Sequence, residues 1–252
     1  MSSVDTEQKP TGLGVDGQVT KEVIEGLRRV CAACVGDVLT GQGLNCVVEG
    51  VYPIDPSMKV CGPAVTLRHI ASRDKKNWTR HAKLLKETCK PGDVLVVDMG
   101  GRTDGASWGD NIAIDARNRG LEGAVIDGGC RQTEAIREIG FPTFIRGKTL
   151  RHTHGTFYST NLNNEPVQIG AAPFSVMVAP GDVIVGDADG LVVVPKETAA
   201  ETLKLAEERH EIHKEARRVR LAGKGVGDAE VDALTVRSRR AEGVEQADGY
   251  RH

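Results

Sequence analysis

The sequence lacks the features that mark several large classes of protein. Lys and Arg number 33 against 35 Asp and Glu, so the formal net charge of −2 offers no broad electrostatic basis for nucleic-acid binding. No apolar run approaches the roughly 20 residues that a membrane-spanning helix needs. Residues 1–19 contain no apolar core of a signal peptide. We therefore expect a flexible tail there, and a protein of the cytoplasm that contacts neither nucleic acid nor membrane.

Cysteine is too sparse for a disulfide scaffold. The six cysteines are scattered between residues 31 and 130, which favours a reducing compartment. Two of them form the motif Cys31-Ala-Ala-Cys34, but a zinc site needs four ligands and no second cysteine pair follows. A thioredoxin-like motif would need a preceding strand, whereas residues 20–35 have the apolar spacing of a helix. We therefore expect two buried helix cysteines.

Several catalytic signatures are also missing from the chain. It contains no GxGxxG after a strand pattern, no P-loop, no GxSxG and no HExxH. The sequence is thus not typical of dinucleotide-binding enzymes, P-loop NTPases, serine hydrolases or zinc proteases.

An alternation of strand and helix patterns occupies the first two thirds of the chain. Apolar runs predict buried strands at 60–67, 93–99, 123–129 and 142–145. Between the last three lie the glycine-rich segment 100–111, expected to be a loop, and helical patterns at 112–120 and 133–140. A further helix is predicted at 78–88. This order indicates an α/β fold whose parallel strands are joined by crossover helices.

The last third has a different character. Short strand patterns at 167–170, 174–179, 182–187 and 190–195 suggest a meandering β layer, and a charged helix follows from 198 to 221. Few apolar positions mark that helix, so it packs along a narrow stripe or reaches a neighbouring subunit. The domain organisation we predict is a flexible tail (1–19), an α/β domain (20–197), a C-terminal helical arm (198–222) and a partly disordered polar tail (223–252).

A charged side chain follows the strand at 123–129. Arg131 begins the next helix, and open α/β sheets bind ligands at the carboxyl ends of their strands. The preceding helix has first-turn amides that suit a carboxylate or phosphate, in Gly109, Asp110, Asn111 and Ile112. Since neighbouring parallel strands bring such turns together, Arg131 could hold an oxyanion against these amides. The alternative is that Arg131 pairs with Asp127 or Asp98 and stabilises the sheet.

Four stretches carry a resemblance to a known family: PGDVLVVDMGG, ASWGDNIAIDARNRGLEGAVIDGGCR, FPTFIRG and PGDVIVGDADGLVVVP. In their order and spacing, from about residue 22 to about residue 215, the chain resembles the RraA-like family. That family includes class II pyruvate aldolases that act on 4-hydroxy-4-methyl-2-oxoglutarate and 4-carboxy-4-hydroxy-2-oxoadipate. Its signature is an acid, twenty intervening residues and then Arg-Asp, and Asp110 and Arg131 match it.

The resemblance implies a fold, an assembly and a set of roles. The fold would be a swivelling β/β/α-type sandwich, assembled as a homotrimer or hexamer with sites between subunits. Arg131 would contact the keto oxygen of pyruvate and steady its enolate, while the amides of residues 109–112 hold the carboxylate. Asp110 would hold metal-bound water. A glutamate from a neighbour's C-terminal helix would serve the same metal, the candidates being Glu207, Glu208, Glu211 and Glu215.

Gln132 departs from the family pattern, because the aldolases carry a metal-binding aspartate directly after the arginine. A neutral amide oxygen can ligate Mg²⁺ or Mn²⁺, but it removes one negative charge from the site. Either metal binding is weakened or lost, or the chemistry persists with Arg131 as the main electrophile or with a metal held elsewhere. His152 and His154 could ligate such a metal or act as acid and base, although polar loop histidines are the simpler interpretation.

The sequence thus predicts a carbon–carbon lyase, an aldolase or decarboxylase, that acts on a small α-keto or hydroxy di-acid. Arg131 would stabilise the enolate, and Asp110 would position a water or metal-bound water as proton carrier. The alternative is a non-catalytic regulator that binds a protein partner, such as RNA-processing machinery, through the charged helix 198–221. Trp108 is expected to pack against the sheet, and His210 and His213 to be solvated.

Overall fold

Helices at the amino end of the chain cover one side of the molecule. The computed structural model describes residues 14, 17–72, 79–153, 157–159 and 164–241 of the 252-residue chain. Instead of one helix over 20–35, it contains α1 (Lys21–Arg29) and α2 (Ala32–Gly41), separated by extended backbone at Val30 and Cys31. The carboxylate of Asp187 accepts the Ala32 N–H at 2.9 Å. Asp187 thereby caps α2, so that a new helix begins at Ala32. Helical spacing contains no signal for such a distant contact, and it therefore suggested one continuous helix.

The centre of the fold is a parallel sheet in the order β3-β4-β6-β7. Its strands are β3 (Val60–Ala71), β4 (Val94–Asp98), β6 (Gly123–Cys130) and β7 (Thr143–Lys148). All four strands were predicted, and β3 continues beyond its expected end at residue 67. In register, Val96 lies between Thr66 and Val125, so the carboxyl ends of the strands lie at one edge. That edge is where the predicted site residues follow β6.

Antiparallel strands extend this sheet and form a second layer. Beyond β3 lie β11 (Val183–Asp187), β12 (Gly190–Val194) and β1 (Val47–Val48). The short β2 (Tyr52–Pro53) pairs with β7, and β8 (Phe157–Ser159) pairs with β3. A separate hairpin consists of β9 (Val167–Ile169) and β10 (Val176–Val178). All four predicted short strands are present, but the single meandering layer is not. β9 and β10 form their own two-stranded sheet, whereas β11 and β12 belong to the large sheet.

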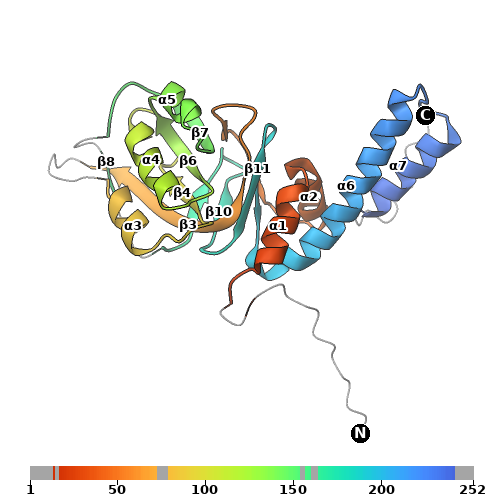
Figure 1. Ribbon diagram of the computed structural model, residues 1–252, viewed down its shortest axis with the longest axis horizontal. Helices are drawn as coiled ribbons and strands as arrows, with labels where there is room; N and C mark the ends of the chain where they lie inside the picture. Colours follow the sequence, from red (N-terminus) through yellow and green to blue (C-terminus); the bar gives the residue numbers. More distant parts are fainter. Residues whose placement is uncertain (1–13, 15–16, 73–78, 154–156, 160–163, 242–252) are drawn as a thin grey trace, which may run out of the picture.

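Three helices cover one face of the parallel strands (Figure 1). They are α3 (His81–Glu87), α4 (Asp110–Asn118) and α5 (Thr133–Glu138), and an apolar core lies between them and the sheet. A second core joins the other face to β9, β10, β11 and β12. A third lies between β11–β12 and the helices α1, α2 and α6. The predicted α/β sandwich is confirmed, with α4 and α5 beginning at the edge that carries the predicted site.

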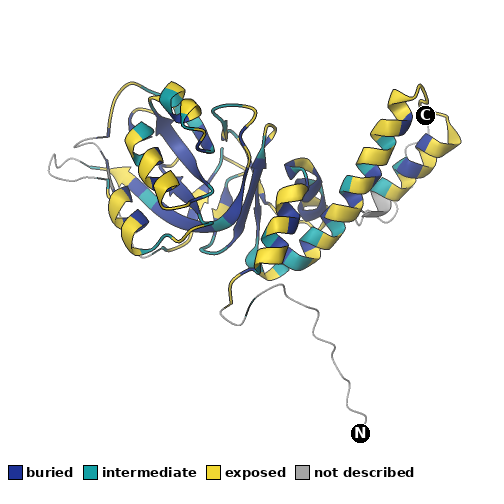
Figure 2. Cartoon of the chain, in the orientation of Figure 1, coloured by how far each residue is buried: buried dark blue, intermediate teal, exposed yellow. Residues whose placement is uncertain are grey.

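A C-terminal arm of two helices projects from the sandwich (Figures 1 and 2). After the turn η1 (Lys196–Thr198), α6 (Ala199–Leu221) follows the predicted course. The polar segment from Gly223 was expected to be partly disordered, yet it contains α7 (Ala229–Ala241). The apolar contacts between these helices come from Ile212, Val219, Val231 and Leu234. None of the helices in the described part of the chain is long and apolar enough to cross a membrane.

A buried ion pair connects two of the central strands. Asp127 in β6 is 1% exposed, and its Oδ1 accepts hydrogen bonds from Arg146 Nε at 2.8 Å and Nη2 at 2.6 Å. The N–H of Gly170 donates to Oδ2 at 3.1 Å. Burial raises the pKa of the Asp127 carboxyl, while the guanidinium of Arg146 opposes that rise. Among the described residues, Arg146 is therefore the single cation that balances the buried charge of Asp127.

Replacing Arg146 with Met should test that dependence. Removing one partner of a buried pair leaves an uncompensated charge, and we expect the free energy of unfolding to fall by about 3–5 kcal/mol. Because burial raises the pKa of Asp127, the deficit should shrink as the pH is lowered through the titration of that carboxyl. Urea denaturation at several pH values measures both effects.

The matched control is Arg137→Met. Arg137 pairs with Glu134 on the exposed surface of α5, where the two side chains are 54% and 82% exposed. Its loss should lower the free energy of unfolding by less than about 1 kcal/mol. Equal losses from the two variants would contradict a special role for the buried pair.

Candidate active site at the carboxyl end of β6

A short strand lies within the glycine-rich segment that was expected to be a loop. This strand, β5 (Ala106–Trp108), runs parallel to β6, with Ala106 opposite Gly129 and Trp108 opposite Cys130. Three residues are too few to show a strand period, so only the pairing reveals it. Trp108 is 1% exposed and stacks on Phe141 at 6.4 Å, which confirms the expected packing role.

Helix α4 begins directly after β5. Gly109 is its N-cap residue in extended conformation, and no side chain caps the helix. The N–H of Asn111 donates to Asp110 Oδ1 at 2.8 Å. The amides of Asp110 and Ile112 are first-turn donors that lack a partner within the helix. The amino end of α4 therefore presents N–H groups and the positive end of the helix dipole.

Arg131 and Gln132 lie against this helix end. The Arg131 N–H donates to the Trp108 carbonyl at 3.1 Å. A Cβ atom added to Gly109 would lie 2.9 Å from Gln132 Oε1 and 3.7 Å from Arg131 Cγ, so the three residues are in close contact. The structure thus brings together the turn 109–112 and Arg131, as the parallel arrangement predicted.

The alternative role of Arg131 as a structural ion pair is wrong in this structure. Asp127 is held by Arg146, and Asp98 accepts a hydrogen bond from Arg68 Nε at 2.7 Å. Across the described residues, the guanidinium of Arg131 forms neither a salt bridge nor a hydrogen bond with another side chain. A half-buried guanidinium without a carboxylate partner beside unpaired amides is suited to bind an anionic ligand.

Gln132 has a backbone conformation that few residues adopt. Its φ of 56° and ψ of 35° place it in the left-handed region, where a residue other than glycine is strained by about 1–3 kcal/mol. Asparagine and aspartate tolerate this region better than glutamine. Sequence reasoning identified the substitution at this position but had no signal for the strain. The turn is thus shaped for a short polar side chain, and glutamine occupies it at a cost.

The donors around Gln132 do not suit a tightly bound hard cation. Among the predicted site residues that the structure describes, the side-chain oxygen donors are the amides of Gln132 and Asn111 and the carboxylate of Asp110. In the described residues, no group of three His, Cys, Asp or Glu side chains converges at this point. Mg²⁺ and Mn²⁺ depend on carboxylate charge, so this set does not fit them well.

The histidine candidates lie apart from this group. His152 forms a parallel bridge with Ala106, at the start of β5, whereas Asp110 follows the end of that strand. Asp110 is four residues beyond Ala106, which is about 13 Å of extended chain. His154 lies outside the described residues. The structure therefore does not place His152 with Arg131 and Gln132.

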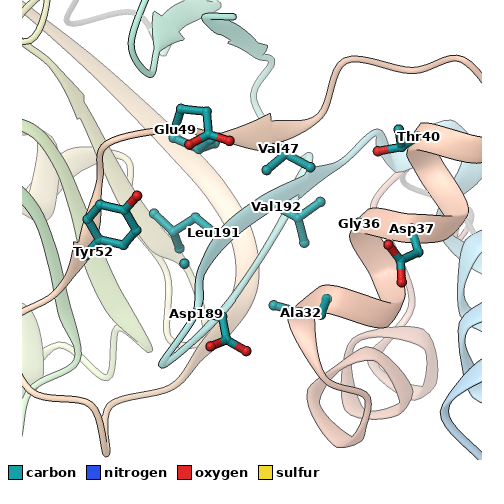
Figure 3. Close-up of a pocket in the computed structure, with 13 residues that line it drawn as sticks. Ala32, Gly36, Asp37, Thr40, Val47, Glu49, Tyr52, Asp189, Leu191 and Val192 are labelled. Atoms are coloured by element: carbon teal, nitrogen blue, oxygen red, sulfur yellow. The ribbon is translucent and has the colours of Figure 1, made fainter. Parts of the chain in front are cut away.

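A separate cavity of about 260 Å³ lies between α2, β1 and the β11–β12 hairpin (Figure 3). Its 13 lining residues include the carboxylates of Asp37, Glu49 and Asp189 and no basic side chain. An anionic ligand would be repelled by these acids. None of the predicted site residues lines this cavity, so the carboxyl end of β6 remains the candidate site.

Comparison with known proteins places the chain in a family. The family model described as RraA-like, Aldolase/RraA, matches residues 23–193. A protein of Halalkalibacterium halodurans named putative 4-hydroxy-4-methyl-2-oxoglutarate aldolase is 34% identical over 192 residues, which cover 76% of this chain and 85% of that protein.

Solved structures agree with this match. Streptomyces coelicolor RraAS2, described as an unusual member of the RNase ES inhibitor RraA protein family, is 32% identical with a TM-score of 0.71, over 80% of this chain and 98% of that chain. An uncharacterized protein from Pseudomonas syringae, 23% identical with a TM-score of 0.73 over 86% of this chain and 98% of that chain, supports the fold alone. The chain belongs to the Aldolase/RraA family.

Proposed function

We propose that this protein is an aldolase-type carbon–carbon lyase, an aldolase or decarboxylase, whose substrate is a small α-keto or hydroxy di-acid. The observation that carries the proposal is the guanidinium of Arg131, which has no acidic partner among the described residues and lies beside the unpaired amides of α4. The name of the Halalkalibacterium relative, a putative aldolase, supports the same reaction class.

Two sets of hydrogen-bond donors bind the substrate, namely the first-turn amides of α4 and the guanidinium of Arg131. The substrate carboxylate next to the keto group accepts hydrogen bonds from the first-turn amides of α4 and is favoured by the helix dipole. Arg131 donates to the keto oxygen, and its planar fork also orients the adjacent carboxylate oxygen. The carbonyl is thereby polarised before any bond breaks.

Cleavage moves an electron pair toward Arg131. The bond between the third and fourth carbons of the substrate breaks, and its electrons form the carbon–carbon double bond of an enolate. The negative charge develops on the keto oxygen that Arg131 holds. A decarboxylase releases the fourth carbon as CO₂, whereas an aldolase releases it as a carbonyl after its hydroxyl loses a proton. Donors aimed at such developing charge lower the barrier by several kcal/mol.

Asp110 supplies the proton path in this proposal. Its Oδ1 accepts the Asn111 N–H, which leaves Oδ2 to hold a water molecule. That water takes the hydroxyl proton in aldol cleavage and returns a proton to the third carbon of the enolate. Pyruvate is then the common product of either reaction.

Because the oxygen donors around Gln132 do not suit a divalent cation, Arg131 provides most of the stabilisation of the enolate charge. A neutral amide replaces the carboxylate that would hold a divalent cation, so the guanidinium is the main fixed positive charge at the keto oxygen. Any Mg²⁺ or Mn²⁺ effect on the rate should accordingly be small.

Assembly as a homotrimer or hexamer in the cytoplasm is part of the proposal. Of the four candidate glutamates on α6, three pair with a Lys or Arg of their own chain. Glu208 is exposed and forms no ion pair among the described residues. It is therefore the glutamate most readily available to a neighbouring subunit.

The second candidate function is regulation through a protein partner. The projecting arm of α6 and α7 favours it, because its outward faces are largely exposed (Figure 2). The Streptomyces relative is described within a family of RNase ES inhibitors. This function needs no turnover, so an assay of pyruvate formation separates the two candidates.

Arg131→Ala should abolish most of the activity. We expect kcat/KM for pyruvate formation from oxaloacetate or 4-hydroxy-4-methyl-2-oxoglutarate to fall about 10²–10³-fold, because the main oxyanion donor is lost. The melting temperature should stay unchanged, since Arg131 makes no ion pair in the described structure. A coupled pyruvate assay with protein-free blanks containing the same metal measures the rate.

Arg137→Ala, on the exposed face of α5, which begins two residues after Arg131, is the control and should retain the native rate. Arg131→Lys keeps the charge but loses the planar fork, so its rate should fall between the two. An unchanged rate per folded molecule in Arg131→Ala would exclude a catalytic role. No pyruvate from either substrate with the native protein would favour the regulatory function.

Gln132→Asp should restore a hard-metal site. The added carboxylate supplies charge, and aspartate also suits the left-handed backbone, so Mn²⁺ should bind about tenfold more tightly or better. Gln132→Asn shares the backbone preference without the charge and should leave Mn²⁺ affinity unchanged. Calorimetric titration of the three proteins measures the affinities. Equal, tight Mn²⁺ binding in all three would show that Gln132 does not control the metal.

A further inference from the structure

The Cys31-Cys34 motif lies at a helix start and faces another helix. Cys31 is the N-cap residue of α2 and is half-buried, whereas Cys34 in the first turn is fully buried. The Cys31 thiol donates to Cys34 Sγ at 2.9 Å. The two sulfur atoms therefore converge on one point, which the expectation of two separate buried helix cysteines did not include.

Helix α6 places His210 at this point and His213 beside Cys34, although both histidines were expected to be solvated. The ligand atoms of Cys31, Cys34 and His210 all lie within 4.8 Å of one another. One turn further along the same helix, His213 Nδ1 lies 3.7 Å from Cys34 Sγ. Both histidines are half-buried. Two thiols from α2 thus face two imidazoles from α6, whose packing against α2 is visible in Figure 1.

Contacts around the cluster hold its ligands in place. Ser238 in α7 lies 3.3 Å from the other ring nitrogen of His213, the position at which metal-binding histidines usually have a hydrogen-bond partner. Arg209, which is 6% exposed, donates to Asp37 Oδ2 from Nε at 2.9 Å and from Nη2 at 2.6 Å. These bonds join α2, α6 and α7 into one rigid frame around the sulfur atoms.

We propose that Cys31, Cys34, His210 and His213 form a structural site for a soft divalent cation, Zn²⁺ in the first place. With Zn–S bonds of about 2.3 Å and Zn–N bonds of about 2.0–2.1 Å, tetrahedral ligand atoms lie about 3.4–3.8 Å apart. The Cys34–His213 distance already has that length. The two sulfur atoms would need to separate by less than about 1 Å, and His213 would need to move closer to Cys31 and His210.

Charge and burial select a soft cation here. Cys34 is fully buried and Cys31 is half-buried, and two thiolates would neutralise the charge of a divalent cation in this buried place. Cys31 and His210 line a cavity of about 220 Å³, which gives an ion a path to the site. Three basic side chains also line this cavity, and their positive charge repels a cation. The affinity for Zn²⁺ must therefore come from the thiolates.

The site would fasten the C-terminal arm to the sandwich. Cys31 and Cys34 belong to the start of α2, whereas the histidines lie in the middle of α6, from which the arm projects. Since α6 has few apolar positions, a metal bridge would supply stability that its packing stripe does not. The site is independent of Arg131, so its failure leaves the lyase proposal untouched.

Metal analysis of the reduced, full-length protein tests the site. We expect one Zn²⁺ per chain after dialysis, and a Co²⁺-substituted protein with intense tetrahedral d–d bands and a thiolate-to-cobalt charge-transfer band. Competition with a chromophoric chelator should show at least 100-fold weaker Zn²⁺ binding in Cys34→Ser and in His210→Ala. Cys89 lies outside the cluster and is half-buried, as Cys31 is, so Cys89→Ser is the control and should bind Zn²⁺ like the native chain.

Removal of Zn²⁺ by the chelator should lower the melting temperature of the native protein but not that of Cys34→Ser. Sub-stoichiometric Zn²⁺ in the reduced native protein would overturn the proposal, and this measurement does not depend on the variants folding. A Co²⁺ spectrum without the thiolate band would do the same. If intact mass reveals a Cys31–Cys34 disulfide and the reduced protein then fails to bind Zn²⁺, the pair is a redox couple instead.

Discussion

The close approach of three chain segments at Gly129 determines how the candidate site is built. A Cβ atom at this position would lie 2.5 Å from the Gly105 carbonyl oxygen and 2.8 Å from Thr149 Cγ2, so no side chain fits. Because Gly129 has no side chain, β5 can pair with the end of β6. That pairing brings Gly109 and the amino end of α4 to Arg131. Without it, the helix amides and the guanidinium would not share a ligand.

Charges at this edge of the sheet are distributed unevenly. Asp98 at the end of β4 and Asp127 in β6 pair in register, and each has its own arginine partner, Arg68 and Arg146. These pairs leave Arg131 as the cation whose compensation must come from outside the described residues. In a partly buried place an unpaired guanidinium favours an anion more strongly than it would in water. Gln132 beside it is neutral, so no negative charge at that position opposes an anion.

Two groups of donor atoms in this molecule differ in ligand type and location. At the edge of the sheet the donors are oxygens, and too few of them are charged for a hard cation. At the junction of α2 and α6 the donors are sulfur and imidazole nitrogen, which suit a soft cation and exclude Mg²⁺. The first location belongs to the proposed chemistry, and the second to the attachment of the arm. The proposed attachment of the arm and the proposed chemistry at Arg131 are therefore independent of each other.

Local patterns in the sequence were sufficient for elements with a clear period or apolar run, including β3, β4, β6 and most of α6, and for the expectation that Arg131 lies beside the start of α4. They failed where long-range contacts decide the structure. Strand β5 has three residues and exists through its pairing with β6, and α2 starts where Asp187 caps it. The left-handed turn at Gln132 has no sequence signal of its own. Cys34 and His213 are 179 residues apart and meet because α6 packs back on α2. Periodicity and propensity report on neighbours along the chain, whereas these features depend on neighbours in space.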